Sequence, residues 1–249
     1  MFRHKGNKRT LKDNLHLAAM LSFVAGMVDV LSLLTIKTLT TNVTGHFAHF
    51  SENISLNDYY TGFIFLIWIL SFLVGAFFSN TIVELLGRKK KNPYSIVLYI
   101  EAFLLFLVGY WCTQINPFSY KNILACILLF SMGMQNSMVT KVSNAIVRTT
   151  HVTGLFTDLG IELSQLFFYK EANEQKLLMG NIKIRLITIL FFFSGGIFCG
   201  VLYSTLALKL FFVAGFIVVC ASFYERLRIN MRHFLRQRNK RKSKIKKDD

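Results

Sequence analysis

The sequence is poor in proline and in charge, and both shortages limit the class of protein. Only 2 of its 249 residues are proline and 17% are charged, whereas 53% are hydrophobic, among them 25 phenylalanines. A typical soluble domain carries about 25% charged residues. The composition therefore argues against an ordinary soluble globular domain and favours a protein that lies within a membrane.

Cysteines are also few, and their spacing forms no pairs. Cys112, Cys126, Cys199 and Cys220 each lie in or beside an apolar run. This is typical of small buried hydrophobic residues, so we expect neither a disulfide framework nor a metal site. The sequence lacks a phosphate-binding glycine loop, a Gly-x-Ser-x-Gly elbow and a His-Glu-x-x-His pair. We therefore expect no enzymatic activity and no cofactor.

Six apolar runs are close to the length of about 18–20 residues that crosses a bilayer. The first run contains Asp29 and is too long for a signal peptide. The sequence predicts an all-α integral membrane protein with a membrane domain over residues 15–225 and polar loops at 38–60 and 140–184. The six predicted spans are residues 16–36, 61–86, 94–111, 122–139, 186–204 and 208–224.

Lysine and arginine lie mostly on one side of this arrangement. Residues 1–14, the turn at 87–93, the loop at 140–185 and the tail after residue 224 hold 5, 4, 6 and 11 of the 29 basic residues. Basic loops stay in the cytoplasm. Both termini, the basic segment 1–14 and the basic tail 226–249, are therefore predicted to be cytoplasmic. Glu84 lies close to the basic turn and is expected to form an interfacial ion pair.

One eight-residue motif occurs twice. Residues 40–47 read TTNVTGHF and residues 149–156 read TTHVTGLF, and six of the eight positions are identical. A Gly-Met pair, at 26–27 and at 133–134, precedes each copy at nearly the same distance. Two matched landmarks in the same order indicate an internal duplication.

Each copy of the duplication holds three spans, at about residues 15–112 and 122–225. Because three is an odd number, the second copy must be inverted in the membrane. Phe72-x-x-Gly75 in the second span of the first copy resembles Phe193-x-x-Gly196 in the second copy. Many secondary transporters are inverted repeats of this kind, with a midplane site where interrupted helices meet.

The motif itself predicts a break followed by a helix start. Thr44 and Thr153 can each cap a short helix, whose free N–H groups favour an anion. After Thr153 the apolar spacing predicts a helix with Asp158 and Glu162 on its polar face. The alternative is that both copies are interfacial turns outside the bilayer.

Asp29 is the most informative single residue. It lies near the middle of the first predicted span, where an isolated charge costs at least about 2.5 kcal/mol. Its counterpart in the second copy is Asn136. An acid opposite an amide can bind a cation, or a proton with a polar solute; the alternative is a hydrogen bond that fixes helix packing. The candidate residues for binding a solute or ion are Asp29, Thr44, Gly45, Glu101, Gln135, Asn136, Thr153 and Gly154.

With these motifs the chain resembles the uncharacterised bacterial YoaK family, also called DUF1275, over roughly residues 15–225. The resemblance rests on Gly26-x-x-Asp29, the two Val-Thr-Gly copies, Gly133-Met134-Gln135-Asn136 and Asp158-Leu159-Gly160. Relatives usually have asparagine where this chain has His46. The resemblance implies a multi-pass protein of the bacterial plasma membrane and no established activity.

The leading functional hypothesis is a small secondary transporter or permease of a small solute or ion. Six spans are few for a transporter, which favours assembly as a homodimer. The alternative is a non-transporting membrane scaffold whose basic tail and 140–185 loop recruit partners. An intramembrane enzyme acting on lipid would need a clustered nucleophile and base, which the sequence does not offer. The basic tail favours anionic lipid head groups over nucleic acid.

Overall fold

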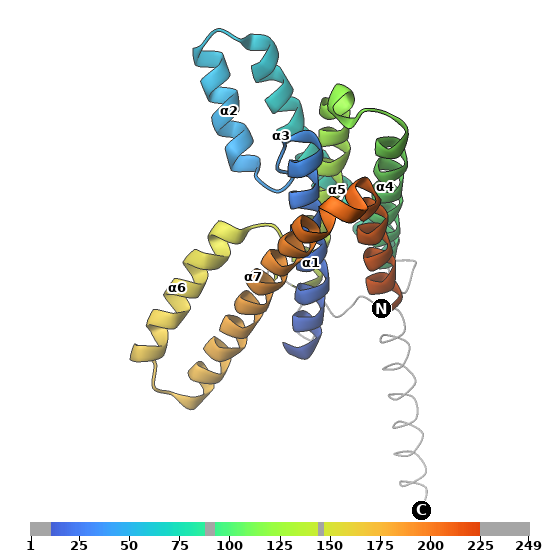
Figure 1. Cartoon of the computed structure of the whole chain (residues 1–249). Helices are drawn as coiled ribbons and strands as arrows, with labels where there is room; N and C mark the ends of the chain where they lie inside the picture. The colour runs from blue at the N-terminus through green and yellow to red at the C-terminus, as the bar shows by residue number, and fades with distance from the viewer. Residues whose placement is uncertain (1–10, 88–92, 144–146, 225–249) are drawn as a thin grey trace, which may run out of the picture.

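The computed structural model describes residues 11–87, 93–143 and 147–224, and in these ranges the chain forms helices and no strand. Segment 1–10, the tail from 225 and most of the basic turn lie outside the described residues. The predictions made for them are therefore not addressed. The elements are α1 Leu11–Ile36, α2 Val43–Ser55, α3 Tyr59–Gly87, α4 Tyr94–Gln114, η1 Pro117–Tyr120, α5 Lys121–Ser143, α6 Val152–Phe168, α7 Ala172–Leu206 and η2 Ala207–Lys209, followed by a helix over residues 210–224 (Figure 1).

Five helical stretches among the described residues are long and apolar enough to cross a membrane. Four of them agree with predicted spans: α1, α3, α4 and the stretch that contains α5. The last, Ala172–Tyr224, has 53 residues and contains both remaining predicted spans. It is interrupted at Ala207, where φ is 45°, and Figure 1 shows the chain turning there from α7 into the helix over 210–224.

The two predicted loops are largely helical, so this part of the prediction was wrong. α2 occupies most of residues 38–60, and α6 with the start of α7 occupies most of residues 140–184. α7 has 35 residues, which makes it about 52 Å long, well beyond the roughly 30 Å of a hydrocarbon core. The helix starts predicted from the motif are present, whereas the assignment of the two whole segments as polar loops missed how far the helices extend. Short helices such as α2 are stabilised by packing more than by propensity.

The helices pair in a regular way. α1 packs along α7, α3 packs along α5, α2 packs on α3 and α6 packs on α7. Figure 1 shows the α2–α3 hairpin and the α6–α7 hairpin extending toward opposite ends of the molecule. α4 packs on α5, close to the helix over residues 210–224. α3 and α7, which follow the motif-carrying helices α2 and α6, thus contact long helices of the other half of the chain, α5 and α1 respectively.

Glycines bring the paired backbones into direct contact. A Cβ added to Gly26 would lie 1.9 Å from the carbonyl oxygen of Phe192, and one added to Gly195 would lie 2.0 Å from that of Phe23. The same reciprocal contact joins α3 to α5, through Gly75 and Phe130 at 2.1 Å and through Gly133 and Phe72 at 2.2 Å. Each crossing therefore joins two Phe-x-x-Gly segments, with small residues at a close-packed interface as in many membrane proteins.

The sequence matched Phe193-x-x-Gly196 with Phe72-x-x-Gly75. In the structure the segment at the crossing begins one residue earlier, at Phe192, and ends at Gly195. The crossing uses Gly195, whereas a Cβ at Gly196 would meet the side chain of Val30. Three consecutive phenylalanines and two consecutive glycines make either register compatible with the sequence.

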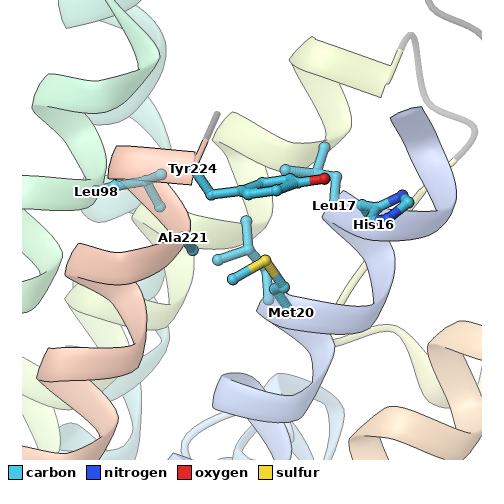
Figure 2. Close-up of a pocket in the computed structure, with 7 residues that line it drawn as sticks. His16, Leu17, Met20, Leu98, Ala221 and Tyr224 are labelled. Atoms are coloured by element: carbon cyan, nitrogen blue, oxygen red, sulfur yellow. The ribbon is translucent and has the colours of Figure 1, made fainter. Parts of the chain in front are cut away.

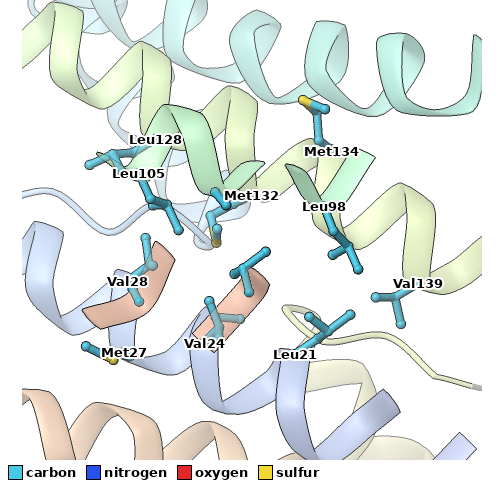
Figure 3. Close-up of a cluster of buried hydrophobic side chains, with 14 of the residues drawn as sticks. Leu21, Val24, Met27, Val28, Leu98, Leu105, Leu128, Met132, Met134 and Val139 are labelled. Atoms are coloured by element: carbon cyan, nitrogen blue, oxygen red, sulfur yellow. The ribbon is translucent and has the colours of Figure 1, made fainter. Parts of the chain in front are cut away.

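Methionine, leucine and valine side chains fill the centre between α1, α4 and α5. Val28 from α1, Leu105 from α4 and Met132 from α5 are entirely buried there, as Figure 3 shows. The outer surfaces remain apolar; Phe77 of α3 and Val201 of α7 are both about 70% exposed. Helices that are apolar on every side belong in a protein core or in lipid, and the exposed sides here suit lipid.

At one edge of this core, Glu84 of α3 forms an ion pair of 2.8 Å with Lys141 of α5. The predicted ion pair of Glu84 is present, with Lys141 of α5 as a partner, and its position at the membrane interface stays a prediction. Both side chains remain substantially exposed to solvent, which limits the contribution of the pair to stability.

Candidate functional site

The first Thr-Thr loop folds back along α1 and reaches Asp29. α1 ends at Ile36, and Lys37 adopts φ 56°, which reverses the chain direction. Thr41 then donates its backbone N–H to Asp29 Oδ1 at 2.9 Å, and Thr40 Oγ1 lies 3.5 Å from the same oxygen. Asp29 is 8% exposed and Thr40 is fully buried. The carboxylate is therefore satisfied by donors from the motif, about two helical turns before the end of α1.

Ser32 fixes the loop from the next turn of α1. Its hydroxyl lies 2.8 Å from the carbonyl oxygen of Thr38 and 2.8 Å from that of Asp29. The loop thus reaches α1 through the Ser32 hydroxyl as well as through the Asp29 carboxylate. Neither Ser32 nor Thr38 was among the predicted site residues.

α2 begins at the predicted break, although Thr44 does not cap it. The N-cap is Asn42, whose side chain accepts from the backbone N–H of Gly45 at 3.0 Å. A Cβ at Gly45 would lie 2.3 Å from the Asn42 amide nitrogen, so glycine leaves room for this cap. Thr44 is exposed. His46 donates through Nε2 to the Leu39 carbonyl oxygen at 2.8 Å, and burial lowers its pKa.

The second Thr-Thr loop reaches Gln135, which directly precedes Asn136, the expected counterpart of Asp29. Thr149 Oγ1 lies 3.3 Å from Gln135 Oε1, and Gln135 Nε2 donates to Glu101 Oε1 at 2.8 Å. All three residues are entirely buried. The loop contact is therefore with Gln135 and not with Asn136, whose Oδ1 has no hydrogen-bond partner among the described residues.

α6 starts at the same motif position as α2. Its N-cap is His151, not Thr153, which is exposed. A Cβ at Gly154 would lie 2.2 Å from the His151 ring, which repeats the close contact between Gly45 and Asn42. Both motif glycines therefore leave room for the N-cap side chain, and the exposed threonines of the motif make no buried contact.

A charged cluster that the sequence analysis missed holds α6 against α7. Arg185 donates to Glu162 through two nitrogens, at 2.7 and 2.9 Å, and to Asp158 at 2.8 Å. Glu162 is buried on the same side of α6 as Leu155 and Leu159. The prediction of an outward polar face with Glu162 was therefore wrong: a carboxylate pair one helical turn apart signalled a basic partner.

The structure thus gathers the predicted site residues into two groups. Asp29 lies with the first loop, and Glu101 and Gln135 lie with the second. The missed participants, Thr40 and Thr149, are the first threonines of the two motif copies, and their repetition was visible in the sequence. Both groups are closed off from solvent.

Two cavities lie away from these groups. Figure 2 shows His16, Met20 and Tyr224 around a cavity of about 10 Å³ between α1, α4 and the helix over 210–224, which is room for a single water. A hollow of about 370 Å³ opens between α3, α4 and α5 and is lined mainly by apolar side chains, such as Leu70 and Phe130. Neither cavity is lined by Asp29, Glu101 or Gln135.

Comparisons with known proteins indicate a membrane protein. The UPF0700 transmembrane protein YoaK of Bacillus subtilis (strain 168) is 26% identical over 187 residues, covering 73% of this chain and 80% of that protein. No solved structure matches the chain significantly. A family model described as "Protein of unknown function (DUF1275)" matches residues 17–224. That match covers most of the chain, which therefore belongs to the DUF1275 family of transmembrane proteins.

Proposed function

We propose that this protein is a small permease for a solute or ion, built from two inverted halves in the bacterial plasma membrane. The first half is α1, α2, α3 and α4, and the second is α5, α6, α7 and the helix over 210–224. In this arrangement the protein crosses the membrane six times and both termini are cytoplasmic. The reciprocal pairing of α1 with α7 and of α3 with α5 supports a pseudo-two-fold relation between the halves.

One observation carries the proposal. Each Thr-Thr loop leaves the end of a long apolar helix and returns to a buried polar side chain, Asp29 in one half and Gln135 in the other. Non-helical backbone at membrane depth is tolerated only where protein or a water-filled cavity surrounds it. Two such loops entering from opposite ends are the arrangement that alternating access requires.

Asp29 and Asn136 lie three residues after the crossing glycines Gly26 and Gly133. Close packing at these glycines gives each half a fixed crossing point, and the polar residues lie about one turn beyond it. A rocking motion about the crossings would expose Asp29 and Asn136 alternately to the two sides. Thr44, Gly45, Thr153 and Gly154 lie at the mouths of the two loops in this scheme.

The test is electrical recording from liposomes that contain the protein on a solid-supported membrane. Rapid exchange to amino acids, sugars, nucleosides, Na⁺ or K⁺ should produce a transient current with one solute class, and Asp29→Asn should abolish it. Asparagine retains an oxygen that accepts from the Thr41 N–H, so this variant should fold. Glu84→Gln, which changes an interfacial pair, is the control.

A current of equal size in wild type and Asp29→Asn would show that Asp29 is not part of the transport site. No current with any solute class would instead favour the non-transporting scaffold. The scaffold alternative further predicts that Asp29→Asn leaves cellular phenotypes unchanged. It also predicts that deletion of the basic tail alters them.

A further inference from the structure

Glu101 is the most deeply buried acid of the described chain. It lies on α4, faces α5 and is 0% exposed. Gln135 donates to its Oε1 at 2.8 Å, whereas Oε2 is buried and has no hydrogen-bond partner among the residues that the structure describes. Asp29, by comparison, receives a backbone N–H and lies beside a threonine hydroxyl. Glu101 therefore sits in a site that provides one donor for two oxygens.

Charged residues on the neighbouring elements are occupied elsewhere. α4 packs against α5, α3 and η2, and it also faces α1. On α1, His16 stacks on Tyr224 and Asp29 accepts from the first loop. Lys141 of α5 pairs with Glu84 of α3, and Lys121 of α5 lies over the ring of Phe118. Lys209 of η2 is exposed. The described part of the helix over 210–224, which also packs on α4, carries no Lys, Arg, His, Asp or Glu.

A carboxylate in such a site is unstable. Removing an ion from water costs several kcal/mol even after relaxation, and a single amide N–H offsets only part of that cost. A proton on Oε2 removes the charge, while Oε1 still accepts from Gln135. A metal cation is disfavoured because Gln135 presents its N–H to Glu101 and not an oxygen ligand.

We propose that Glu101 is a proton-binding site, and that the proton it carries is the coupling ion of the permease. The second part rests on the proposed function; the first part does not. In the described state the O–H bond is on Oε2. When the site opens, that bond breaks, the proton passes to an entering water molecule, and the electron pair stays on the carboxylate.

Gln135 connects this proton to the second Thr-Thr loop. Its amide nitrogen holds Glu101, and its oxygen accepts from Thr149 at 3.3 Å. A carboxylate at position 101 needs more hydrogen-bond donors than the neutral acid does. We expect the amide group of Gln135 to move toward it and water molecules to enter. Gln135 then cannot hold Thr149 in the same position, so loss of the proton releases the loop over residues 147–151.

Infrared spectroscopy of the protein in lipid nanodiscs tests the proton directly and needs no transported solute. Wild type at neutral pH should show a carboxylic-acid C=O band that Glu101→Gln lacks and Glu84→Gln retains. The band should give way reversibly to carboxylate bands at alkaline pH. Wild type grown with ¹³C-glutamate should show the band displaced, which assigns it to glutamate even if Glu101→Gln folds poorly. Absence of the band in wild type, or its persistence in folded Glu101→Gln, would overturn the proposal.

Thiol labelling tests the coupling to the loop. In a background without the four native cysteines, Arg148→Cys reports on the loop and the exposed position Ser119→Cys corrects for thiolate formation. The ratio of the two labelling rates should rise at the pH at which the infrared band disappears, and Glu101→Gln should abolish that rise. A pH dependence unchanged by Glu101→Gln would contradict the coupling. Proton binding without solute current would support the first part, that Glu101 binds a proton, and would overturn both the permease and the role of the proton as its coupling ion.

Discussion

Replacing Gly195 with alanine should destabilise the protein by about 1–3 kcal/mol or more, because overpacking of a close helix contact forces backbones apart. The new Cβ would lie 2.0 Å from the carbonyl oxygen of Phe23 and 3.1 Å from the amide nitrogen of Met27. Both obstacles are backbone atoms that cannot rotate away, so α1 and α7 must separate along their whole contact. Unfolding by SDS in mixed micelles measures the change in free energy.

Gly200→Ala is the matched control, since it lies on the same helix with no atom within 4 Å of the added Cβ. Alanine is the better helix former by about 0.5–1 kcal/mol, so this variant should be neutral or slightly more stable. Equal effects of Gly195→Ala and Gly200→Ala would mean that α1 and α7 do not cross as described.

Replacing Arg185 with methionine should cost about 3–5 kcal/mol, because it leaves a buried carboxylate without its cation. The Glu162 side chain is 9% exposed and receives two donors from Arg185. The third hydrogen bond of Arg185, to Asp158, is lost as well. We expect the α6–α7 hairpin to open first, which limited proteolysis would detect together with the loss of unfolding free energy.

The interfacial pair provides the control for this effect. Lys141→Met removes a cation from Glu84, whose side chain is 53% exposed, and should cost about 0–1 kcal/mol. The double variant Arg185→Met with Glu162→Met should recover most of the loss, because apolar replacements of buried ion pairs are often neutral. Equal costs for Arg185→Met and Lys141→Met would show that the α6–α7 cluster is solvated.

The long apolar helices could be predicted from the sequence because their signal is local. A run such as residues 61–86 needs no partner to be recognised, and its helical boundaries in α3 differ by only a few residues. The repeated motif was equally visible, since two copies of one motif can be compared without knowing where they lie. Membership of the DUF1275 family followed from the same motifs.

The contacts of the motif could not be predicted, because they depend on the path by which each loop folds back onto the preceding long helix. Thr44 and Thr153 stood out through their pairing with glycine, yet both are exposed, and Thr40 and Thr149 reach the buried polar groups. Thr41 contacts a residue 12 positions earlier. Such contacts follow from the reversal at Lys37, which no periodicity in the sequence indicates.

Glu101 illustrates the same limit. Its position inside an apolar run marked it as unusual, but its partner lies 34 residues away on α5. Repeat symmetry pointed to Asn136 as the counterpart of Asp29, whereas the hydrogen bond from the loop goes to the preceding residue, Gln135. The repeated glycines therefore match between the two helix crossings more closely than the polar side chains near them do.

The central claim is that two inverted halves bring the motif copies in from opposite sides of the membrane. The most direct measurement is labelling of Thr44→Cys and Thr153→Cys, singly and in a cysteine-free background, with a membrane-impermeant maleimide. Both positions are exposed and lie at the start of α2 and α6. The account predicts that Thr44→Cys reacts in intact cells and Thr153→Cys only in inside-out vesicles. Reaction of both from the same side would contradict it.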